Sequence, residues 1–367
     1  MTDFMSLAQP GIRSLQPYQP GKPVEELERE LGISDIIKLA SNENPLGASP
    51  KVKDALAAAM AELERYPDGS AYTLKQALAG KLGVAMDSLT IGNGSNDVLE
   101  LLARVFVSKD DEMIVSQHCF VVYPLAAMAI GATLTQIPAK DYGMDLDATL
   151  AAISDRTRMI CVANPNNPTG TWLETPAIEA FLARVPDHVI VILDEAYFEY
   201  AREFGCPDGI SLMSKHPNLV ITRTFSKAYG LAALRIGYSV SHPDVADLMN
   251  RLRQPFNVNS LALAAALAAL DDDDFIAQSI DLNRAGLTHL CEACDDMGLG
   301  YIPSAGNFLT IDVGGDALPV YDALLQEGVI TRPIGGYGLP NHLRVTVGTG
   351  AENERFLVAL RKVLGRD

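Results

Sequence analysis

The sequence predicts an α/β protein built on a mostly parallel sheet, and three apolar runs carry this prediction. Residues 158–163, 189–193 and 219–221 are short, rich in β-branched and aliphatic side chains, and bounded by polar or turn-forming residues. Runs of this kind are typical of strands that are buried on both faces of a parallel sheet. Open α/β sheets bind ligands at the carboxyl ends of their strands, so we expect a site along that edge.

Composition places the chain among globular proteins and argues against some classes of binding partner. Of the 367 residues, 48% are hydrophobic and 20% charged, which suffices for two lobes with sizeable cores. The net charge of -17 argues against nucleic acid or an anionic membrane surface as partner. The longest apolar run, residues 261–270, is shorter than the roughly 20 residues of a membrane helix. No signal segment opens the chain, so we expect a cytoplasmic protein.

The cysteines and acidic runs do not indicate a disulfide framework or a metal site. The chain has five cysteines, an odd number, and Cys291 and Cys294 lie at helical spacing without a second pair to complete a zinc site. We interpret both as core residues. The acidic residues 271–274 are interpreted as a solvated surface.

The other elements follow from apolar periodicity and from turn residues. Prolines and glycines predict an extended arm over residues 11–23, and Pro50 predicts the first turn of a helix. Further strands are expected at 89–91, 112–116 and 236–240, and further helices at 243–253 and from about residue 260 through residues 271–274.

The segment after the third apolar run can hold a cofactor covalently. Lys227 lies just past the strand end, Ser226 precedes it, and Arg235 follows eight positions later. A lysine amine can bind a carbonyl cofactor while a hydroxyl and a guanidinium bind its phosphate. Asp194, after the second run, could keep a pyridine nitrogen protonated, as a ring that withdraws electrons requires. Asn167, after the first run, offers an amide to a ring oxygen.

A glycine-containing turn upstream offers further phosphate ligands. Gly92 and Gly94 form part of a dinucleotide-binding fingerprint, but Asp97 replaces its third glycine, and the motif is weak even when complete. The better interpretation is that the backbone amides of Gly94, Ser95 and Asn96, at the start of a helix, bind the cofactor phosphate.

Three motifs in this order resemble the fold-type I family of pyridoxal phosphate (PLP) enzymes. They are N-N-P-T-G at residues 166–170, D-E-A-Y at 194–197, and S-K followed by an arginine. The resemblance implies a large domain with a mostly parallel seven-stranded sheet sandwiched by helices, and a smaller α+β domain. Residues 45–265 would form the large PLP-binding domain. Residues 1–44 would form the N-terminal arm, and residues 266–367 would form the small domain.

The resemblance also implies three catalytic residues, Lys227, Asp194 and Tyr197. Lys227 would bind PLP covalently, and Asp194 would pair with the pyridine nitrogen. Asn167 and Tyr197 would bond the phenolic oxygen of the ring.

The remaining cofactor contacts are implied in the same way. Ser226 and Arg235 would bind the phosphate, and Tyr123 would stack on the ring, with Phe120 as the other candidate. Residues 118–119 are His-Cys where many relatives have Pro-Thr. In similar aminotransferases the tyrosine of the R-Y-P-D-G motif, here Tyr66, reaches the phosphate of the other subunit, which implies a homodimer.

Two further motifs, S-N-E-N-P-L-G at residues 41–47 and the segment 332–344, extend the resemblance to the histidinol-phosphate aminotransferases. This implies exchange of an amino group between L-histidinol phosphate and 2-oxoglutarate by a ping-pong mechanism. The implied substrate contacts are Tyr18, Asn44, Asn307, Arg332 and Arg344.

Three other functions are compatible with the same motifs. An aromatic amino acid aminotransferase is the nearest alternative, because imidazole and phenyl rings can share one apolar pocket. A PLP-dependent threonine-phosphate decarboxylase has overlapping motifs. A PLP-sensing regulator is disfavoured because no DNA-binding segment precedes the arm and the chain is acidic.

Overall fold

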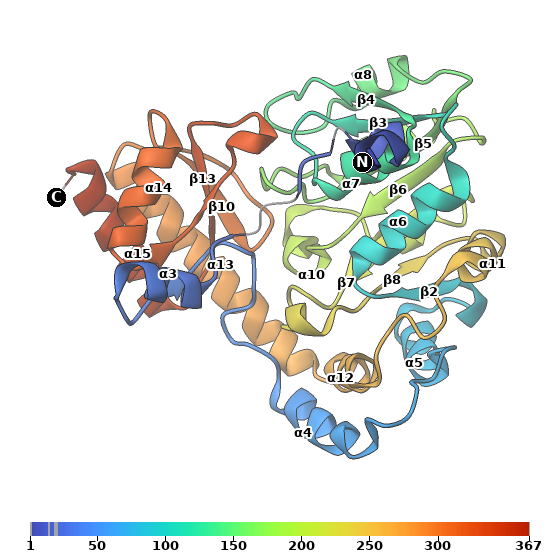
Figure 1. Ribbon diagram of the computed structural model, residues 1–367, viewed down its shortest axis with the longest axis horizontal. Helices are drawn as coiled ribbons and strands as arrows, with labels where there is room; N and C mark the ends of the chain where they lie inside the picture. The colour runs from blue at the N-terminus through green and yellow to red at the C-terminus, as the bar shows by residue number, and fades with distance from the viewer. Residues whose placement is uncertain (1, 14, 18–20, 367) are drawn as a thin grey trace.

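The computed structural model describes residues 2–13, 15–17 and 21–366, and its main feature is a seven-stranded sheet with helices on both faces (Figure 1). The strand order is β2-β8-β7-β6-β5-β3-β4. β8 runs antiparallel to both neighbours, and the other pairs are parallel, which confirms the predicted class. The strands are β2 (Leu89–Gly92), β3 (Glu112–Ser116), β4 (Thr133–Ile137), β5 (Thr157–Ala163), β6 (Ile190–Asp194), β7 (Leu219–Thr224) and β8 (Gly237–Val240).

The strands β3, β5, β6 and β7 alternate between two cores, one on each face of this sheet. In β5, Ile160 and Val162 belong to one core, and Met159 and Cys161 to the other. Because both sets of side chains are buried, the strands appear in the sequence as continuous apolar runs. The first core includes residues of α4 (Pro50–Ala59), α5 (Tyr72–Leu82), α9 (Thr175–Leu182) and α12 (Ser260–Leu270); the second includes α6 (Ser95–Phe106), α7 (Val122–Ile130) and α11 (Pro243–Leu252).

A four-stranded sheet of order β12-β13-β10-β9 has a separate core. β1 (Ile37–Lys38) pairs in parallel with β11 (Val329–Ile330), so a segment from the start of the chain lies beside this unit. The proposed domain limits, residues 45–265 against 1–44 with 266–367, stay a prediction. The unit contains β9 (Gly300–Ile302), β10 (Phe308–Asp312), β12 (Arg332–Pro333), β13 (His342–Thr346), α13 (Asp273–Asp296), α14 (Ala317–Gln326) and α15 (Gly350–Leu364).

The long helix expected from residue 260 through the acidic run is wrong. The chain forms two helices there, α12 and α13, with a break at residues 271–272. The Asp272 carboxylate accepts a hydrogen bond from the backbone N–H of Phe275 and so caps the start of α13. An aspartate at this position starts a helix more readily than it continues one. In Figure 1, α13 then runs from the region of α12 toward α15.

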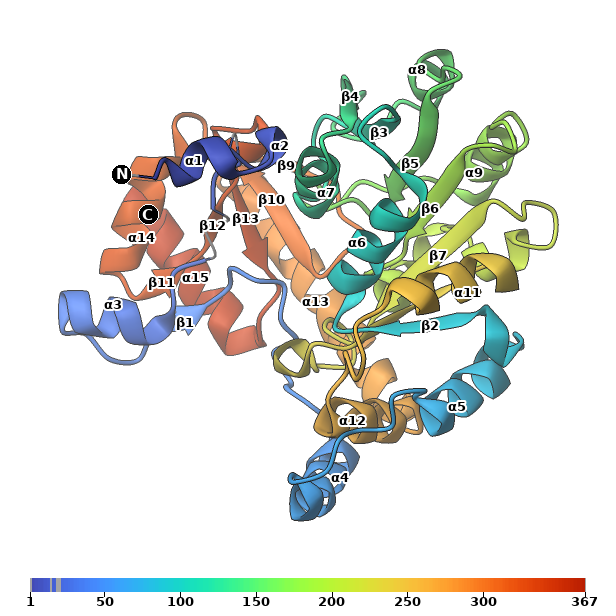
Figure 2. The same cartoon turned by 45° about the vertical axis from the view of Figure 1, so that its right-hand side comes forward.

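The extended arm expected at residues 11–23 is helical in part. α2 (Pro10–Arg13) packs against α7, as Figure 2 shows. A Cβ on Gly11 would lie 1.8 Å from the carbonyl oxygen of Met128, so this contact needs glycine. The remaining short elements are α1 (Phe4–Leu7), α3 (Val24–Leu31), α8 (Leu146–Ala151), α10 (Phe198–Ala201), η1 (Met60–Glu62), η2 (Met86–Ser88), η3 (Arg202–Phe204), η4 (Gly209–Leu212), η5 (Ala232–Leu234) and η6 (Gly335–Tyr337).

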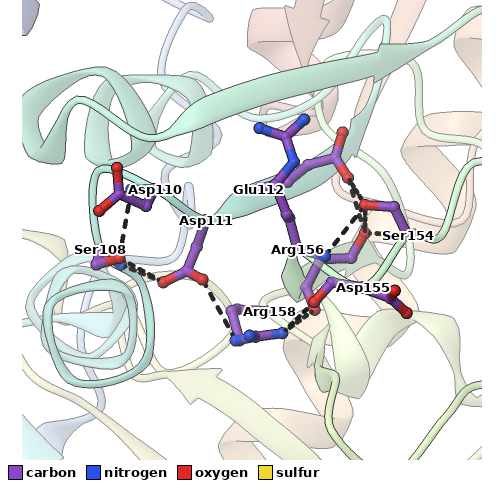
Figure 3. Close-up of polar contacts among 9 residues, drawn as sticks. Ser108, Asp110, Asp111, Glu112, Ser154, Asp155, Arg156 and Arg158 are labelled. Carbon is purple, nitrogen blue, oxygen red and sulfur yellow. Dashed lines mark hydrogen bonds and ion pairs between the residues drawn. The ribbon is translucent and has the colours of Figure 1, made fainter.

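A polar cluster closes the amino-terminal end of β3 and β5 (Figure 3). Glu112 accepts hydrogen bonds from the hydroxyls of Ser154 at 3.0 Å and Thr157 at 2.8 Å. Arg158 Nε lies 3.3 Å from the Asp111 carboxylate. The cluster ties the starts of neighbouring strands together, at the end of the sheet opposite the predicted site.

Cys291 and Cys294 lie on α13, where Cys294 is fully buried and Cys291 packs against the same core. In the described part of the chain, no group of three or more His, Cys, Asp or Glu residues could hold a metal ion. Within those same ranges, every helix is too short or too polar to cross a bilayer.

Candidate active site

A buried carboxylate stands where β6 ends. Asp194 is 4% exposed. Thr222, on the neighbouring strand, donates a hydrogen bond to its Oδ1 at 2.9 Å, and the Tyr123 hydroxyl donates to its Oδ2 at 2.6 Å. Burial raises the pKa of Asp194, and these two hydrogen bonds oppose that rise. A positively charged N–H group in the cavity would therefore stabilise the carboxylate form.

Lys227 lies just beyond β7, with its amine inside the same cavity. Its Nζ donates to the Ser41 carbonyl oxygen at 3.2 Å and lies 5.7 Å from the centre of the Tyr197 ring. Burial first, and then the charges of Arg344 and Arg235, lower the pKa of Lys227 to about 7. The neutral, nucleophilic amine is thus well populated at neutral pH.

The start of α6 forms a cradle for an anion. Its N-cap is Gly94, at φ 85°, which offers no side chain to the first N–H groups of the helix. A Cβ on Gly94 would lie 2.6 Å from Arg235 Nη2, and a Cβ on Gly237 would lie 2.5 Å from the Ser95 nitrogen. Arg235 Nη1 also donates to Ser226 Oγ at 3.3 Å. The two glycines let a guanidinium, a hydroxyl and helix N–H groups converge on one point.

A hydrogen-bond network covers the opposite side of the cavity. Arg344 Nη1 donates to Asn167 Oδ1 at 2.6 Å, and Nη2 donates to the Ala40 carbonyl oxygen at 2.7 Å. The Tyr197 hydroxyl accepts from Asn42 Nδ2 at 2.8 Å. Burial raises the pKa of Tyr197 to about 12, and the Arg344 charge opposes the rise. Tyr197 therefore keeps its proton near neutral pH and can donate it to a ligand oxygen.

Two arginines stand opposite each other in the four-stranded sheet. Arg332 of β12 and Arg344 of β13 are cross-strand partners, and both line the cavity. Like charges directly opposite each other destabilise a strand pair. An anion bound between or beside the two guanidinium groups would offset this repulsion, so the pair is suited to carboxylate or phosphate.

Most of these groups line one cavity of about 200 Å³. The predicted contact Gly94 is not a lining residue itself, but it directly precedes Ser95 and Asn96, which are. The cavity thus brings together polar groups from the large sheet, from the segment around residue 41 and from β12 and β13. Predicted site residues that line it are Ser95, Asn96, Tyr123, Asn167, Asp194, Tyr197, Ser226, Lys227, Arg235, Arg332 and Arg344.

Asn44 and Asn307 are buried but are not among the residues that line this cavity. Asn44 Nδ2 donates to the Ala228 carbonyl oxygen at 2.8 Å and to Ser279 Oγ at 2.9 Å. Asn307 Nδ2 donates to the Asn42 carbonyl oxygen at 3.0 Å. Both amides hold the segment around residues 41–44 in place, and the substrate contacts expected of them stay predictions.

Tyr66 is not among the residues that line the cavity. Tyr66 is 82% exposed, and its ring stacks on Phe256 with 4.7 Å between centroids. The contact expected of Tyr66 with a partner subunit stays a prediction. Tyr18 lies outside the described residues.

Tyr123, the predicted stacking residue, also makes a polar contact that stacking on a ring does not require. It is 2% exposed, and its hydroxyl is engaged by Asp194. Phe120 also lines the cavity, and its ring meets Tyr123 edge-on, with 5.9 Å between centroids and 83° between planes. Stacking by Tyr123 stays a prediction, and Phe120 is the candidate that has no competing polar contact.

Sequence reasoning missed two residues that hold predicted catalytic side chains in place. Asn42 bonds the Tyr197 hydroxyl, and Thr222 bonds Asp194. Asn42 lies in the S-N-E-N-P-L-G motif, from which the resemblance implies Asn44 as the substrate contact. Thr222 had a usable signal in the sequence, because it is a polar residue directly after the apolar run 219–221. In the structure its side chain is fully buried beside the Asp194 strand.

The donor set fits a ring cofactor that carries a phosphate. The Gly94 cradle, which a Cβ would fill, suits the phosphate, and Asp194 suits a protonated ring nitrogen. Lys227 suits a carbonyl group, and Asn167 and Tyr197 suit a ring oxygen. These are the groups that PLP presents.

Comparisons with known proteins agree with this fit. Residues 34–360 match the family described as Aminotransferase class I and II. The chain is 57% identical over 366 residues to histidinol-phosphate aminotransferase 2 of Pseudomonas fluorescens, covering 99% of each chain. It is 56% identical over 367 residues to histidinol-phosphate aminotransferase 1 of Idiomarina loihiensis, covering 100% of each. The crystal structure of histidinol-phosphate aminotransferase from Sinorhizobium meliloti in complex with PLP matches with a TM-score of 0.90, at 32% identity and 97% coverage of each chain.

Proposed function

Because this chain belongs to the family of class I and II aminotransferases, we propose that it exchanges an amino group between L-histidinol phosphate and 2-oxoglutarate. The products are imidazole-acetol phosphate and L-glutamate, and the reaction is a step of histidine biosynthesis. The observation that carries the proposal is a single cavity in which Asp194 and Lys227, at neighbouring strand ends, face the Arg332 and Arg344 pair.

The cofactor is PLP, which when bound supplies an electron-withdrawing ring beside the substrate amine. We assign its covalent attachment to Lys227 and its ring nitrogen to Asp194. The phosphate is assigned to the start of α6 with Ser226 and Arg235. Phe120 replaces Tyr123 as our candidate for the stacking residue, since the Tyr123 hydroxyl is engaged by Asp194.

Proton movement at the substrate is assigned to Lys227. Transamination removes a proton from the substrate carbon next to the amine and returns a proton at a neighbouring atom. A group whose pKa lies near the working pH can do both, and the pKa of Lys227 is lowered to about 7. Asn167 and Tyr197 are assigned to the ring oxygen, where their hydrogen bonds fix the ring relative to Lys227 Nζ.

Recognition of the two substrates is assigned to the arginine pair. L-Histidinol phosphate carries a phosphate and no carboxylate, whereas glutamate carries two carboxylates. A guanidinium fork binds either group with two hydrogen bonds, so Arg332 and Arg344 can serve both half-reactions of a ping-pong mechanism. Tyr18 is assigned to the same anions by resemblance alone.

We further propose that the enzyme is a cytoplasmic homodimer. Tyr66 is 82% exposed, and Met60, Leu63 and Tyr72 near it in the sequence are exposed as well. Exposed apolar side chains of this size are typical of a surface that a second subunit covers. All five cysteines are free thiols, as in proteins of a reducing compartment. Light scattering on the purified protein tests the dimer, and a monomer at micromolar concentration would contradict it.

The half-reaction of the yellow holoenzyme tests the proposed activity. The enzyme is mixed separately with L-histidinol phosphate, phenylalanine and tyrosine, and loss of the cofactor absorbance is followed. We expect rapid loss with L-histidinol phosphate and slow loss with the aromatic amino acids. Equal or faster loss with phenylalanine or tyrosine would instead identify an aromatic amino acid aminotransferase.

A further inference from the structure

Two pieces of chain that are distant in sequence face each other across the cavity. The loop after β3 carries Phe120, and the segment after β12 carries Tyr337; both line the cavity. His118 links the two pieces, because its Nδ1 lies 2.6 Å from the Tyr337 carbonyl oxygen. We propose that His118 is a positioning residue that fixes the substrate-binding segment against the cofactor-binding loop. This inference rests on the proposed function.

His118 is held firmly on the side of the large sheet. It is 6% exposed, and its own carbonyl oxygen accepts a hydrogen bond from Asn166 Nδ2 at 2.7 Å. The same Asn166 amide donates to Thr169 Oγ1 at 2.8 Å. Asn166 precedes Asn167, so the turn that anchors His118 also supplies a wall of the cofactor cavity. His118 is therefore fixed relative to the cofactor.

The partner of His118 leads directly to an anion-binding residue. Tyr337 ends η6, which begins three residues after Arg332. The backbone N–H of Ile334, between the two, donates to the His342 carbonyl oxygen at 3.3 Å, a long hydrogen bond. Arg332 and Tyr337 both line the cavity. A displacement of η6 would therefore move the substrate-binding side, and the His118 bond opposes that displacement.

The His118 ring is buried, with Gly338 and the ring of Tyr142 beside it. A Cβ on Gly338, at φ 80°, would lie 3.5 Å from His118 Cε1. Tyr142 has a φ of 62°. Its ring centroid lies 6.5 Å from that of His118 and 5.9 Å from that of His342. Asp141 and Tyr142 are the central residues of a two-residue turn closed by Lys140 and Gly143, where positive φ is usual. The turn places the Tyr142 ring beside both histidines.

The direction of the hydrogen bond makes the proposal specific. A carbonyl oxygen can accept but not donate, so His118 Nδ1 carries the proton. In an asparagine at this position, the side-chain nitrogen can take the place of Nδ1. In a glutamine, the nitrogen falls nearer the place of Nε2, which points away from Tyr337. Asparagine should therefore preserve the link, whereas glutamine and alanine should lose it.

The test compares His118→Ala, His118→Asn and His118→Gln in the holoenzyme. Loss of one hydrogen bond that orders the segment is expected to raise KM for both glutamate and L-histidinol phosphate by about tenfold in the alanine and glutamine variants. The asparagine variant should stay within about twofold of the wild type. kcat should change much less than KM in each of them, because Lys227 and Asp194 are untouched. The matched control is His188→Ala, an exposed histidine before the amino end of β6.

A second readout does not depend on turnover. Binding of glutarate, a dicarboxylate without an amine or keto group, is measured by titration calorimetry. We expect weaker binding by about tenfold in the alanine and glutamine variants and near wild-type binding in the asparagine variant. Cofactor absorbance should be the same in all variants. Unchanged KM and glutarate binding in the alanine variant, or equal losses in the asparagine and glutamine variants, would overturn the role of His118.

Failure of the proposed function is distinguishable from failure of this inference. If wild-type enzyme does not react with L-histidinol phosphate but reacts with an aromatic amino acid, the proposed activity is wrong. The asparagine and glutamine variants can then still be compared by KM for glutamate and by glutarate binding. If the alanine variant does not fold, the comparison of His118→Asn with His118→Gln decides the role of His118, since asparagine and glutamine are both polar and close to histidine in size.

Discussion

The two ends of the seven-stranded sheet each bury a carboxylate, but the two carboxylates have opposite pKa shifts. At the amino-terminal end, burial raises the pKa of Glu112, but hydrogen bonds from Thr135, Thr157 and Ser154 together outweigh it, and the pKa is lowered. Figure 3 shows Glu112 with Ser154. At the carboxyl end, burial outweighs two hydrogen bonds, and the pKa of Asp194 is raised.

This difference separates a structural carboxylate from a functional one. Glu112 accepts three hydroxyl hydrogen bonds from its own chain, so its charge is stabilised without a ligand. Asp194 lies beside a cavity, and a ligand can complete its stabilisation. We therefore expect changes at the carboxyl end to affect catalysis, and changes at the amino-terminal end to affect stability.

The largest effect is expected for Lys227→Ala at the carboxyl end. Covalent attachment and proton transfer are both lost, so kcat should fall by about 10⁴-fold. Stopped-flow measurement of the half-reaction checks this, with the exposed Lys215→Ala as control. Activity within about tenfold of the wild type would show that another group moves the proton.

Asp194→Asn should lower kcat by about 10²- to 10³-fold, because the amide cannot stabilise a positively charged ring nitrogen as a carboxylate does. The unfolding midpoint of the cofactor-free protein should stay the same or rise, since a buried charge is removed. Denaturant titration and steady-state kinetics measure the two effects. A large loss of stability with normal kcat would place Asp194 in the same class as Glu112.

Arg344→Ala tests the part of the carboxyl end that comes from the other sheet. KM for glutamate should rise by about 30- to 100-fold, because a carboxylate loses a two-pronged contact. The cofactor absorbance should remain. Arg344→Lys, which keeps the charge but loses the fork, should be intermediate. An unchanged KM would contradict the assignment of this arginine to the substrate.

Glu112→Gln is the matched change at the amino-terminal end. It should lower the free energy of unfolding by about 1–3 kcal/mol, because a buried acceptor of three hydroxyls is replaced by a group that can serve them less well. kcat and KM should stay at wild-type values. Denaturant midpoints and steady-state kinetics check this, and a catalytic defect without a stability loss would contradict the division between the two ends.

The last expected effect is a pH dependence of stability that changes no residue of the wild type. The pKa of Lys227 is about 7 in the folded cofactor-free protein, against an ordinary value of 10.5. Between these values the unfolded chain holds the proton and the folded chain does not, so the free energy of unfolding rises with pH. This group alone should contribute about 1.4 kcal/mol per pH unit. The difference between wild type and Lys227→Ala from pH 7 to pH 9 isolates it, and parallel curves would contradict the lowered pKa.

The sequence by itself determined the class of the sheet, six of its seven strands and the residues near three strand ends; it missed the edge strand β4. Asp194 directly follows an apolar run, Asn167 and Lys227 lie within a few residues of one, and parallel strands bring their carboxyl ends to one edge. Such residues can be found from local patterns, because each one lies close in the sequence to the strand that positions it. Local patterns gave a wrong prediction at residues 271–272. Apolar periodicity predicted one continuous helix there, whereas Asp272 caps the start of a second helix.

The tertiary structure alone decided which distant groups complete the site. Arg344 bonds the Ala40 carbonyl, and Asn42 bonds Tyr197, across 304 and 155 positions of the chain. Asn42 and Asn44 are the same residue type in one motif, yet one faces the cavity and the other ties the motif to α13. A side chain's hydrogen-bond partner depends on where the folded backbone places donors and acceptors, and no spacing within a short segment encodes a partner that lies hundreds of residues away.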